Sequence, residues 1–293
     1  MGSNTGSTVP RRQLGRYLRK LRNEAGLSVR AAASALEWSE TKLWRVESGQ
    51  SPMRALDAGA LCALYGASAE MTEALQGLAR ETRARGWWHS YGDSVPPGFD
   101  LFIGLEAAAS RMDWYQIELI PGLFQTDEYA REVQRHYLPD APDEEIERRV
   151  QVRLARQSIL TRADNPPELR VVLSEAAIRR PIRDRAAMSN QLRRLVEFST
   201  MSTVDLRVVP LSAGLHLGSQ TKPFIIRRFP SQPGSGVAEP PTVYADGFTG
   251  DLYLDKPVEV ARFDYAFQVI WETAASPEET RRLLGEVAAE YEA

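Results

Sequence analysis

A short polar stretch holds the side chains best suited to chemistry on another molecule. After Ser39, four residues in seven carry hydrogen-bonding or charged groups: Glu40, Thr41, Lys42 and Arg45. Side chains of these types read the donor and acceptor pattern of base edges in the DNA major groove. They can do so only from a helix that presents its first turns to the groove, with apolar residues behind them.

The surrounding sequence predicts such a helix. Apolar residues at helical spacing indicate a helix over 11–25, and Ser28 is a natural N-cap for a second helix over 29–36. Ser39 caps a third helix, 39–48, whose apolar side is Leu43, Val46 and Trp44, and glycine ends it. Two short helices about three residues apart predict a helix-turn-helix. The alternative is any small all-α bundle with a basic surface.

These residues carry a family resemblance. The strings are Leu14-Gly15, Leu18-Arg19, Leu21-Arg22, Gly26-Leu27-Ser28, Ala32-Ala33, Leu36, Ser39 and Glu47-Ser48-Gly49. They resemble the Xre family of lambda-repressor/Cro-like DNA-binding domains. The resemblance implies a structural ion pair between Arg22 and Glu47. It also implies a five-helix domain over 11–84, completed by helices at 54–65 and 70–84.

The resemblance assigns DNA contacts position by position. Ser28 and Ser39 would touch phosphates at helix N-termini, and the four polar residues after Ser39 would face base edges. The expected phosphate anchors are Arg16, Arg19 and Arg30, for which a solvated surface position is the alternative. Several family members have Gln or Asn where Glu40 and Thr41 stand here, so the operator sequence does not transfer from relatives.

The net charge of −3 conceals an uneven distribution. Between residues 11 and 54, ten basic side chains accompany four acidic ones, which gives +6 there and −9 over the remainder. A small basic module is therefore joined to a larger acidic one. The lone Cys62 and three separated histidines exclude a disulfide scaffold and a Cys/His zinc site. With no signal peptide or long apolar run, a cytoplasmic protein with a disordered tail over 1–10 is expected.

Residues 86–293 predict a larger α+β domain. The helical stretches are 127–138, 142–162, 184–200 and 257–291, and the strands are 169–173, 204–210, 223–229 and 242–245. Residues 102–120 fit either class, because only 115–119 alternate. The Pro, Gly and Ser residues of 230–241 predict a mobile loop.

Further motifs extend the resemblance over nearly the whole chain. They are Leu105-Glu106-Ala107, Pro121-Gly122-Leu123-Phe124-Gln125-Thr126 with Tyr129-Ala130, Ala155-Arg156-Gln157, Glu175-Ala176 with Ile178-Arg179-Arg180, Gln191-Leu192 and Val209-Pro210-Leu211. They resemble actinobacterial Xre-type regulators whose C-terminal domain is poorly characterised. Members are often encoded beside a small partner protein and are described as antitoxin-like or as developmental regulators.

The hexapeptide 121–126 has two interpretations. It predicts a turn at Pro121-Gly122 and an N-cap at Thr126, with Leu123 and Phe124 docked into a core. The functional alternative is a ligand or partner groove lined by aromatic residues: Trp87, Trp88, Trp114 and Tyr115.

An enzymatic role is not expected. Ala213-Gly214, Ser219 and Lys256 superficially match a self-cleaving Ser/Lys repressor, but the residues around Ser219 do not. No zinc-protease, phosphate-loop or nucleophile-elbow motif occurs. We therefore expect a homodimeric, sequence-specific regulator of transcription that binds duplex DNA, without cofactor, metal or membrane. The alternative is an antitoxin-like protein whose acidic domain neutralises a small protein encoded nearby.

Overall fold

The computed structural model describes residues 8–83, 86–95, 99–230, 239–247 and 251–292. The chain forms two compact units, a helical unit and a sheet unit. The helical unit comprises residues 1–92 and 96–108, and the sheet unit comprises 93–95 and 109–293. An N-terminal bundle of five helices followed by an α+β part is the predicted fold class, which is confirmed.

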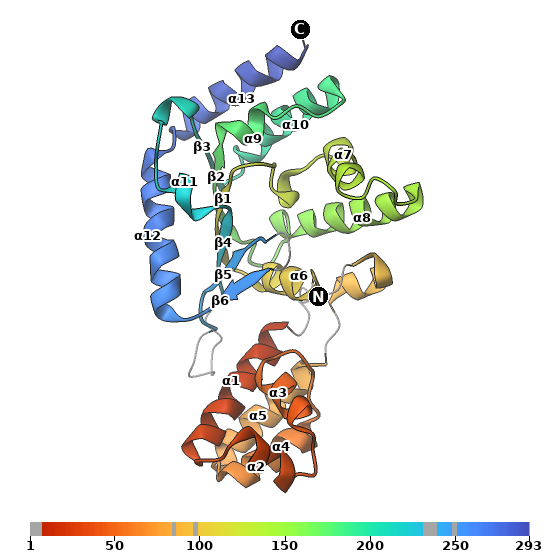
Figure 1. Cartoon of the computed structure of the whole chain (residues 1–293), viewed down its shortest axis with the longest axis vertical. Coiled ribbons are helices and arrows are strands. Elements are labelled where there is room, and N and C mark those ends of the chain that lie inside the picture. The colour runs from red at the N-terminus through yellow and green to blue at the C-terminus, as the bar shows by residue number, and fades with distance from the viewer. Residues whose placement is uncertain (1–7, 84–85, 96–98, 231–238, 248–250, 293) are drawn as a thin grey trace. The chain divides into compact units, whose positions relative to one another are not determined.

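Five α-helices make up the first part of the helical unit (Figure 1): α1 Thr8–Glu24, α2 Val29–Ala35, α3 Glu40–Glu47, α4 Ala55–Tyr65 and α5 Ala69–Glu81. Serine hydroxyls cap α2, α3 and α5, and Gly66 ends α4 in the left-handed conformation. Their inner faces share one core that includes Leu14, Leu18, Leu43 and Leu61. A short 3-10 segment, Trp87–Ser94, follows.

Helix α6, Phe99–Ala108, packs with the helical unit, although the sequence predicts it within the domain over 86–293. Its Gly104 lies close to the start of α1, since a Cβ there would overlap Thr8 Oγ1. Thr8 and Val9 are buried, which explains why α1 begins within the expected tail. Residues 1–7 of that tail lie outside the described residues.

The sheet unit is built on six strands in the order β3-β2-β1-β4-β5-β6. They are β1 Arg111–Gln116, β2 Glu168–Ser174, β3 Val204–Val209, β4 Phe224–Arg228, β5 Thr242–Ala245 and β6 Leu252–Leu254. The pairs among β1, β2 and β3 are parallel, and those among β1, β4, β5 and β6 are antiparallel. The four strands predicted from sequence are present, β1 resolves the ambiguous stretch, and β6 carried no recognised signal.

Helices cover both faces of this sheet (Figure 1). Helix α12, Pro257–Thr273, packs on one face through Phe267 and Ile270, against Tyr115, Phe224 and Ile226. The opposite side holds α7 Asp127–Tyr137, α8 Asp143–Arg156 and α10 Arg185–Phe198. The shorter elements are η2 Gly122–Phe124, η3 Gln157–Leu160, α9 Glu175–Arg179, η4 Leu211–Ala213 and α11 Gly218–Thr221.

Two predictions in the sheet unit need correction. The stretch 257–291 is not one helix, because the chain breaks after Thr273 and resumes as α13, Pro277–Glu292. The helix predicted over 142–162 ends at Arg156 and tightens into η3. The turn and cap expected in 121–126 are present, since Thr126 accepts a hydrogen bond from Tyr129 N and Leu123 and Phe124 are buried. Of the loop 230–241, residues 231–238 lie outside the described residues.

Candidate nucleic-acid interface

Helices α2 and α3 form the two-helix element that the sequence predicts. Ser28 Oγ accepts a hydrogen bond from Ala31 N, and Ser39 Oγ accepts one from Lys42 N, both at 3.1 Å. Between the helices, Glu37 adopts a left-handed backbone conformation, and Trp38 N donates to Ala33 O at 2.8 Å. The two caps fix where each helix begins and direct their first N–H groups outward, as anion contacts require.

Helix α3 has one buried and one exposed side. Leu43 and Val46 are buried in the core of the unit, whereas Glu40, Thr41 and Arg45 are exposed. Trp44, expected on the apolar side, is instead 51% exposed. With 3.6 residues per turn, position 44 lies closer to 41 and 45 than to the core side. The exposed face thus carries a hydroxyl, a carboxylate, a guanidinium and an indole ring.

Three of the predicted contact residues, Lys42, Arg30 and Glu40, already have partners in the protein. Lys42 Nζ lies 3.5 Å from the ring centroid of Trp38 and 3.9 Å from Asp57 Oδ2, at the side of α3. Arg30 Nε is 4.0 Å from Glu40 Oε1, and both side chains are largely exposed. Contacts of this kind between exposed groups are weak and exchange readily for phosphate.

A buried ion pair joins α3 to α1. Arg22 donates two hydrogen bonds to Glu47, at 2.6 and 2.9 Å, and a third to Leu27 O. The hydrogen bonds to Glu47 raise the pKa of Arg22. Arg19, expected to anchor a phosphate, donates to Glu47 O at 3.0 Å, although its side chain is still 48% exposed. Arg16 on the same helix is half-buried.

Glycine permits this close approach of the two helices. A Cβ at Gly15 would lie 2.6 Å from Val46 O and 2.7 Å from Glu47 O. The pair Leu14-Gly15 therefore has a direct structural meaning: the leucine enters the core and the glycine lets the end of α3 rest on α1. The same contact aligns Glu47 with Arg22, so the position of α3 is set by packing and charge together.

The aromatic groove suggested by the sequence is not formed as expected. Trp87 and Trp88 belong to the helical unit, whereas Trp114 and Tyr115 are consecutive residues of β1 in the sheet unit. Side chains alternate along a strand, so Trp114 and Tyr115 point to opposite faces of the sheet. Trp88, Trp114 and Tyr115 are buried, and burial raises the pKa of Tyr115 to about 12.

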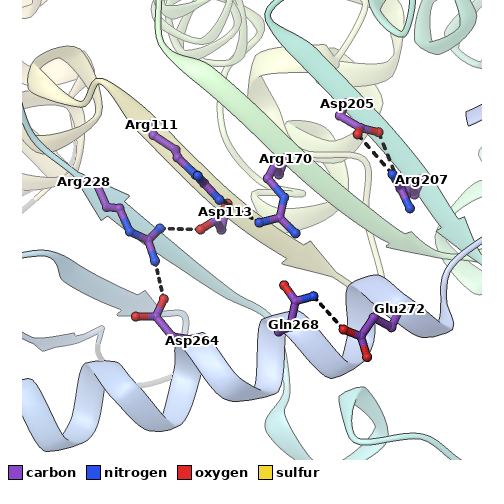
Figure 2. A network of polar contacts seen from close by, with 9 residues as sticks. All are labelled: Arg111, Asp113, Arg170, Asp205, Arg207, Arg228, Asp264, Gln268 and Glu272. Carbon is purple, nitrogen blue, oxygen red and sulfur yellow. Dashed lines mark hydrogen bonds and ion pairs between the residues drawn. The ribbon is translucent and has the colours of Figure 1, made fainter.

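The sheet unit contains a polar network that was not predicted from the sequence (Figure 2). Asp113 on β1 is 3% exposed and accepts hydrogen bonds from Arg111 and from Arg228. Arg228 also bonds Asp264 on α12. The available signal was the pairing of opposite charges two residues apart inside apolar strands, which places both on the same face.

Among the described residues, no three His, Cys, Asp or Glu side chains are grouped so that they could hold a metal ion. Among the residues that the structure describes, every helix is too short or too polar to span a membrane.

Comparison with known families places both parts of the chain. Residues 13–75 match a profile described as a helix-turn-helix domain, which covers most of α1, all of α2 to α4 and part of α5. Residues 99–286 match a profile described as a domain of unknown function, DUF5753. Searches of curated proteins and of solved structures give no match. The chain therefore belongs to the DUF5753 family, with a helix-turn-helix domain preceding the family domain.

Proposed function

We propose that this protein is a sequence-specific DNA-binding regulator of transcription that reads the major groove with helix α3. The observation that carries the proposal is the two-sided character of α3. Leu43 and Val46 hold it in the core, while Thr41 and Arg45 extend from its exposed face within a matched helix-turn-helix domain. A helix docked in this way presents its first two turns to base edges.

The exposed side chains have distinct roles in this proposal. Arg45 suits guanine, because a guanidinium can donate two hydrogen bonds to O6 and N7, and Thr41 suits either base edge or the thymine methyl group. Glu40 can accept a hydrogen bond from the N4 amino group of cytosine once its ion pair with Arg30 is broken. Arg30 and Arg16 then serve phosphates, together with the amide groups at the N-termini of α2 and α3.

We further propose that the protein acts as a homodimer and by binding alone. One helix reads few base pairs, so two-fold pairing on half-sites about one helical turn apart would supply the missing specificity. Against a self-cleaving role, the Lys256 side chain is 78% exposed and its Nζ lies 3.5 Å from Glu259. A lysine that acts as a general base is normally desolvated.

The experiment has two stages. Genomic fragments that the purified protein retains at low salt are first recovered and sequenced, and a duplex of the enriched sequence is then titrated by fluorescence anisotropy. We expect Arg45→Ala to weaken specific binding about tenfold or more, the range for losing one bidentate base contact. Arg282→Ala is the matched control, since Arg282 is an exposed α13 arginine paired with Glu286.

Two outcomes would contradict the proposal. If the wild-type protein retained no genomic fragment, the proposal that the protein binds DNA would be wrong. If Arg45→Ala and Arg282→Ala bound the enriched duplex with equal affinity, the proposal that α3 contacts the bases would be wrong.

A further inference from the structure

On the α12-side face of the sheet, three arginines have hydrogen-bonded carboxylate partners and a fourth has none among the described residues. Four guanidinium groups lie there, on four neighbouring strands (Figure 2): Arg111, Arg170, Arg207 and Arg228. Three aspartates accompany them: Asp113, Asp205 and Asp264. The remaining acid in view, Glu272 on α12, accepts a hydrogen bond from Gln268 Nε2 at 2.7 Å.

Three of these arginines have ordinary partners. Arg111 and Arg228 both donate to Asp113, and Arg228 also donates to Asp264. Arg207 donates to both oxygens of Asp205, at 3.2 and 3.3 Å. Each of the three aspartates is therefore already an acceptor for an arginine other than Arg170.

Arg170 differs from the other three. Its nearest carboxylate oxygen is Asp113 Oδ1, at 3.9 Å from Nη1, and no hydrogen bond links its guanidinium to any residue that the structure describes. The side chain is nevertheless only 25% exposed. Burial lowers its pKa, and Asp113 opposes that shift only in part. A guanidinium has five N–H donors, and leaving them unmatched in a partly buried position is unfavourable.

Aromatic rings hold Arg170 in place without satisfying its donors. Its Cζ lies 4.1 Å from the ring centroid of Trp271 and 5.0 Å from that of Phe267. Arg207, from the next strand, lies 4.0 Å from the same Trp271 ring. Stacking fixes the plane of a guanidinium and leaves its N–H edge free, the arrangement that recognises carboxylate and phosphate groups.

We propose that Arg170, assisted by Arg207, forms a binding site for the carboxylate or phosphate group of a small anionic ligand. The ligand would accept two hydrogen bonds from the edge of Arg170, whose donors have no hydrogen-bond acceptor among the described residues. This site lies within the sheet unit and does not depend on the proposed DNA-binding role.

The test is isothermal titration of the full-length protein with inorganic phosphate and, separately, with citrate, at constant ionic strength set by chloride. We expect at least one of the two anions to bind the wild-type protein, and the stronger of the two shows whether the site prefers phosphate or carboxylate. Arg170→Met retains the stacking volume and should weaken that binding about tenfold or more. Arg282→Met, which removes a distant exposed arginine, should bind as the wild type does.

Stability measured without either anion provides a second readout. If Arg170 is an open binding group, Arg170→Met should unfold no more easily than the wild type. Arg228→Met should unfold more easily, because it removes a partner of the buried Asp113. Should Arg170→Met fail to fold, Arg170→Lys keeps the charge, removes the planar fork and should likewise weaken anion binding.

The proposal is overturned by either of two results. One is the absence of binding of both anions to the wild type at millimolar concentration. The other is equal binding to the wild type and to the Arg170 variants, which would identify an adventitious ion only.

Discussion

At the scale of single residues, Glu47 makes the polar contacts that join α1 to α3 in the helical unit. Its carboxylate is 2% exposed and accepts both hydrogen bonds of the Arg22 pair, while its backbone carbonyl accepts from Arg19. One residue thus ties α1 to the end of α3. Because α3 carries the proposed reading face, the pair positions that face without touching DNA itself.

Replacing Glu47 tests this role. Glu47→Gln leaves the buried Arg22 guanidinium without a counter-ion, and breaking a buried pair in this way costs about 3–5 kcal/mol. Denaturant unfolding of the full chain should show this loss in the transition of the helical unit. The control is Glu24→Gln, which removes an exposed carboxylate 3.8 Å from Lys20 and should change stability by less than about 0.5 kcal/mol. Equal effects of the two changes would contradict the structural role of Glu47.

His216 provides a pH-dependent prediction at the same scale. Its Nδ1 accepts a hydrogen bond from Gly218 N at 3.1 Å, and burial lowers its pKa below the ordinary value of 6.5. In the unfolded chain the imidazole takes up a proton near that ordinary value, whereas the folded chain resists it. The unfolded state then binds more protons, so stability falls as pH decreases below about 6.5.

The matching measurement compares unfolding free energies between about pH 7.5 and 5.5. His216→Gln keeps an acceptor for Gly218 N but cannot take up a proton. It should therefore show a smaller loss of stability on acidification than the wild type. An identical pH profile for both proteins would show that His216 does not contribute.

The sequence identified residues of the proposed DNA interface. It did not identify the arginine cluster of the sheet unit. Arg22 and Glu47 match a family motif, so the resemblance to that family implies their contact. Arg170 and Arg207 become neighbours only because β2 pairs with β3 in parallel, and both meet Trp271 only because α12 returns over them. Non-local pairing of this kind has no local sequence signal.

At the scale of elements, caps and periodicity were the dependable signals. The serine N-caps predicted the starts of α2 and α3, and a glycine predicted the end of α3, each to within one or two residues. The break between α12 and α13 was missed although it has a local signal, because Ser276 and Glu279 form a capping box and Pro277 is the first residue of α13. The break also makes non-local contacts. Ala275 N donates to Val208 O, and Thr280 Oγ1 accepts from Val208 N, so the break covers the outer edge of β3.

This edge contact can be tested at Thr280, which is fully buried. Thr280→Val has nearly the same shape but leaves the Val208 N–H without an acceptor, at a cost of about 1–3 kcal/mol. Denaturant unfolding should register the loss, and hydrogen exchange at the Val208 amide should accelerate. Thr273→Val is the control, because that hydroxyl donates only to the helical carbonyl of Val269. A Val208 amide that remains as protected as in the wild type would contradict the edge role.

At the scale of the whole molecule, the net charge of −3 is divided unevenly between the first 108 residues and the rest of the chain. Residues 1–108 hold 13 basic and 11 acidic side chains, and residues 109–293 hold 23 and 28, so the two parts carry +2 and −5. The basic excess is concentrated further, at +6 between residues 11 and 54. We expect the negative charge of the sheet unit to disfavour the binding of a polyanion such as DNA. The positive charge around α3 should favour it.

This division predicts how a fragment should bind DNA. The fragment is best ended at residue 108, because α6 packs on α1 and an end at residue 84 would remove the helix that covers Thr8. Once freed of the acidic unit, residues 1–108 should bind a half-site duplex more tightly than the full chain at low salt. The advantage should shrink with added salt, since the screening length falls from about 10 Å at 0.1 M to about 3 Å at 1 M. Anisotropy titrations over a salt series measure this. Equal affinities at every salt concentration would mean that the acidic charge has no effect on DNA. Weaker binding by the fragment throughout would instead mean that the sheet unit contributes to binding, as a dimerisation domain would.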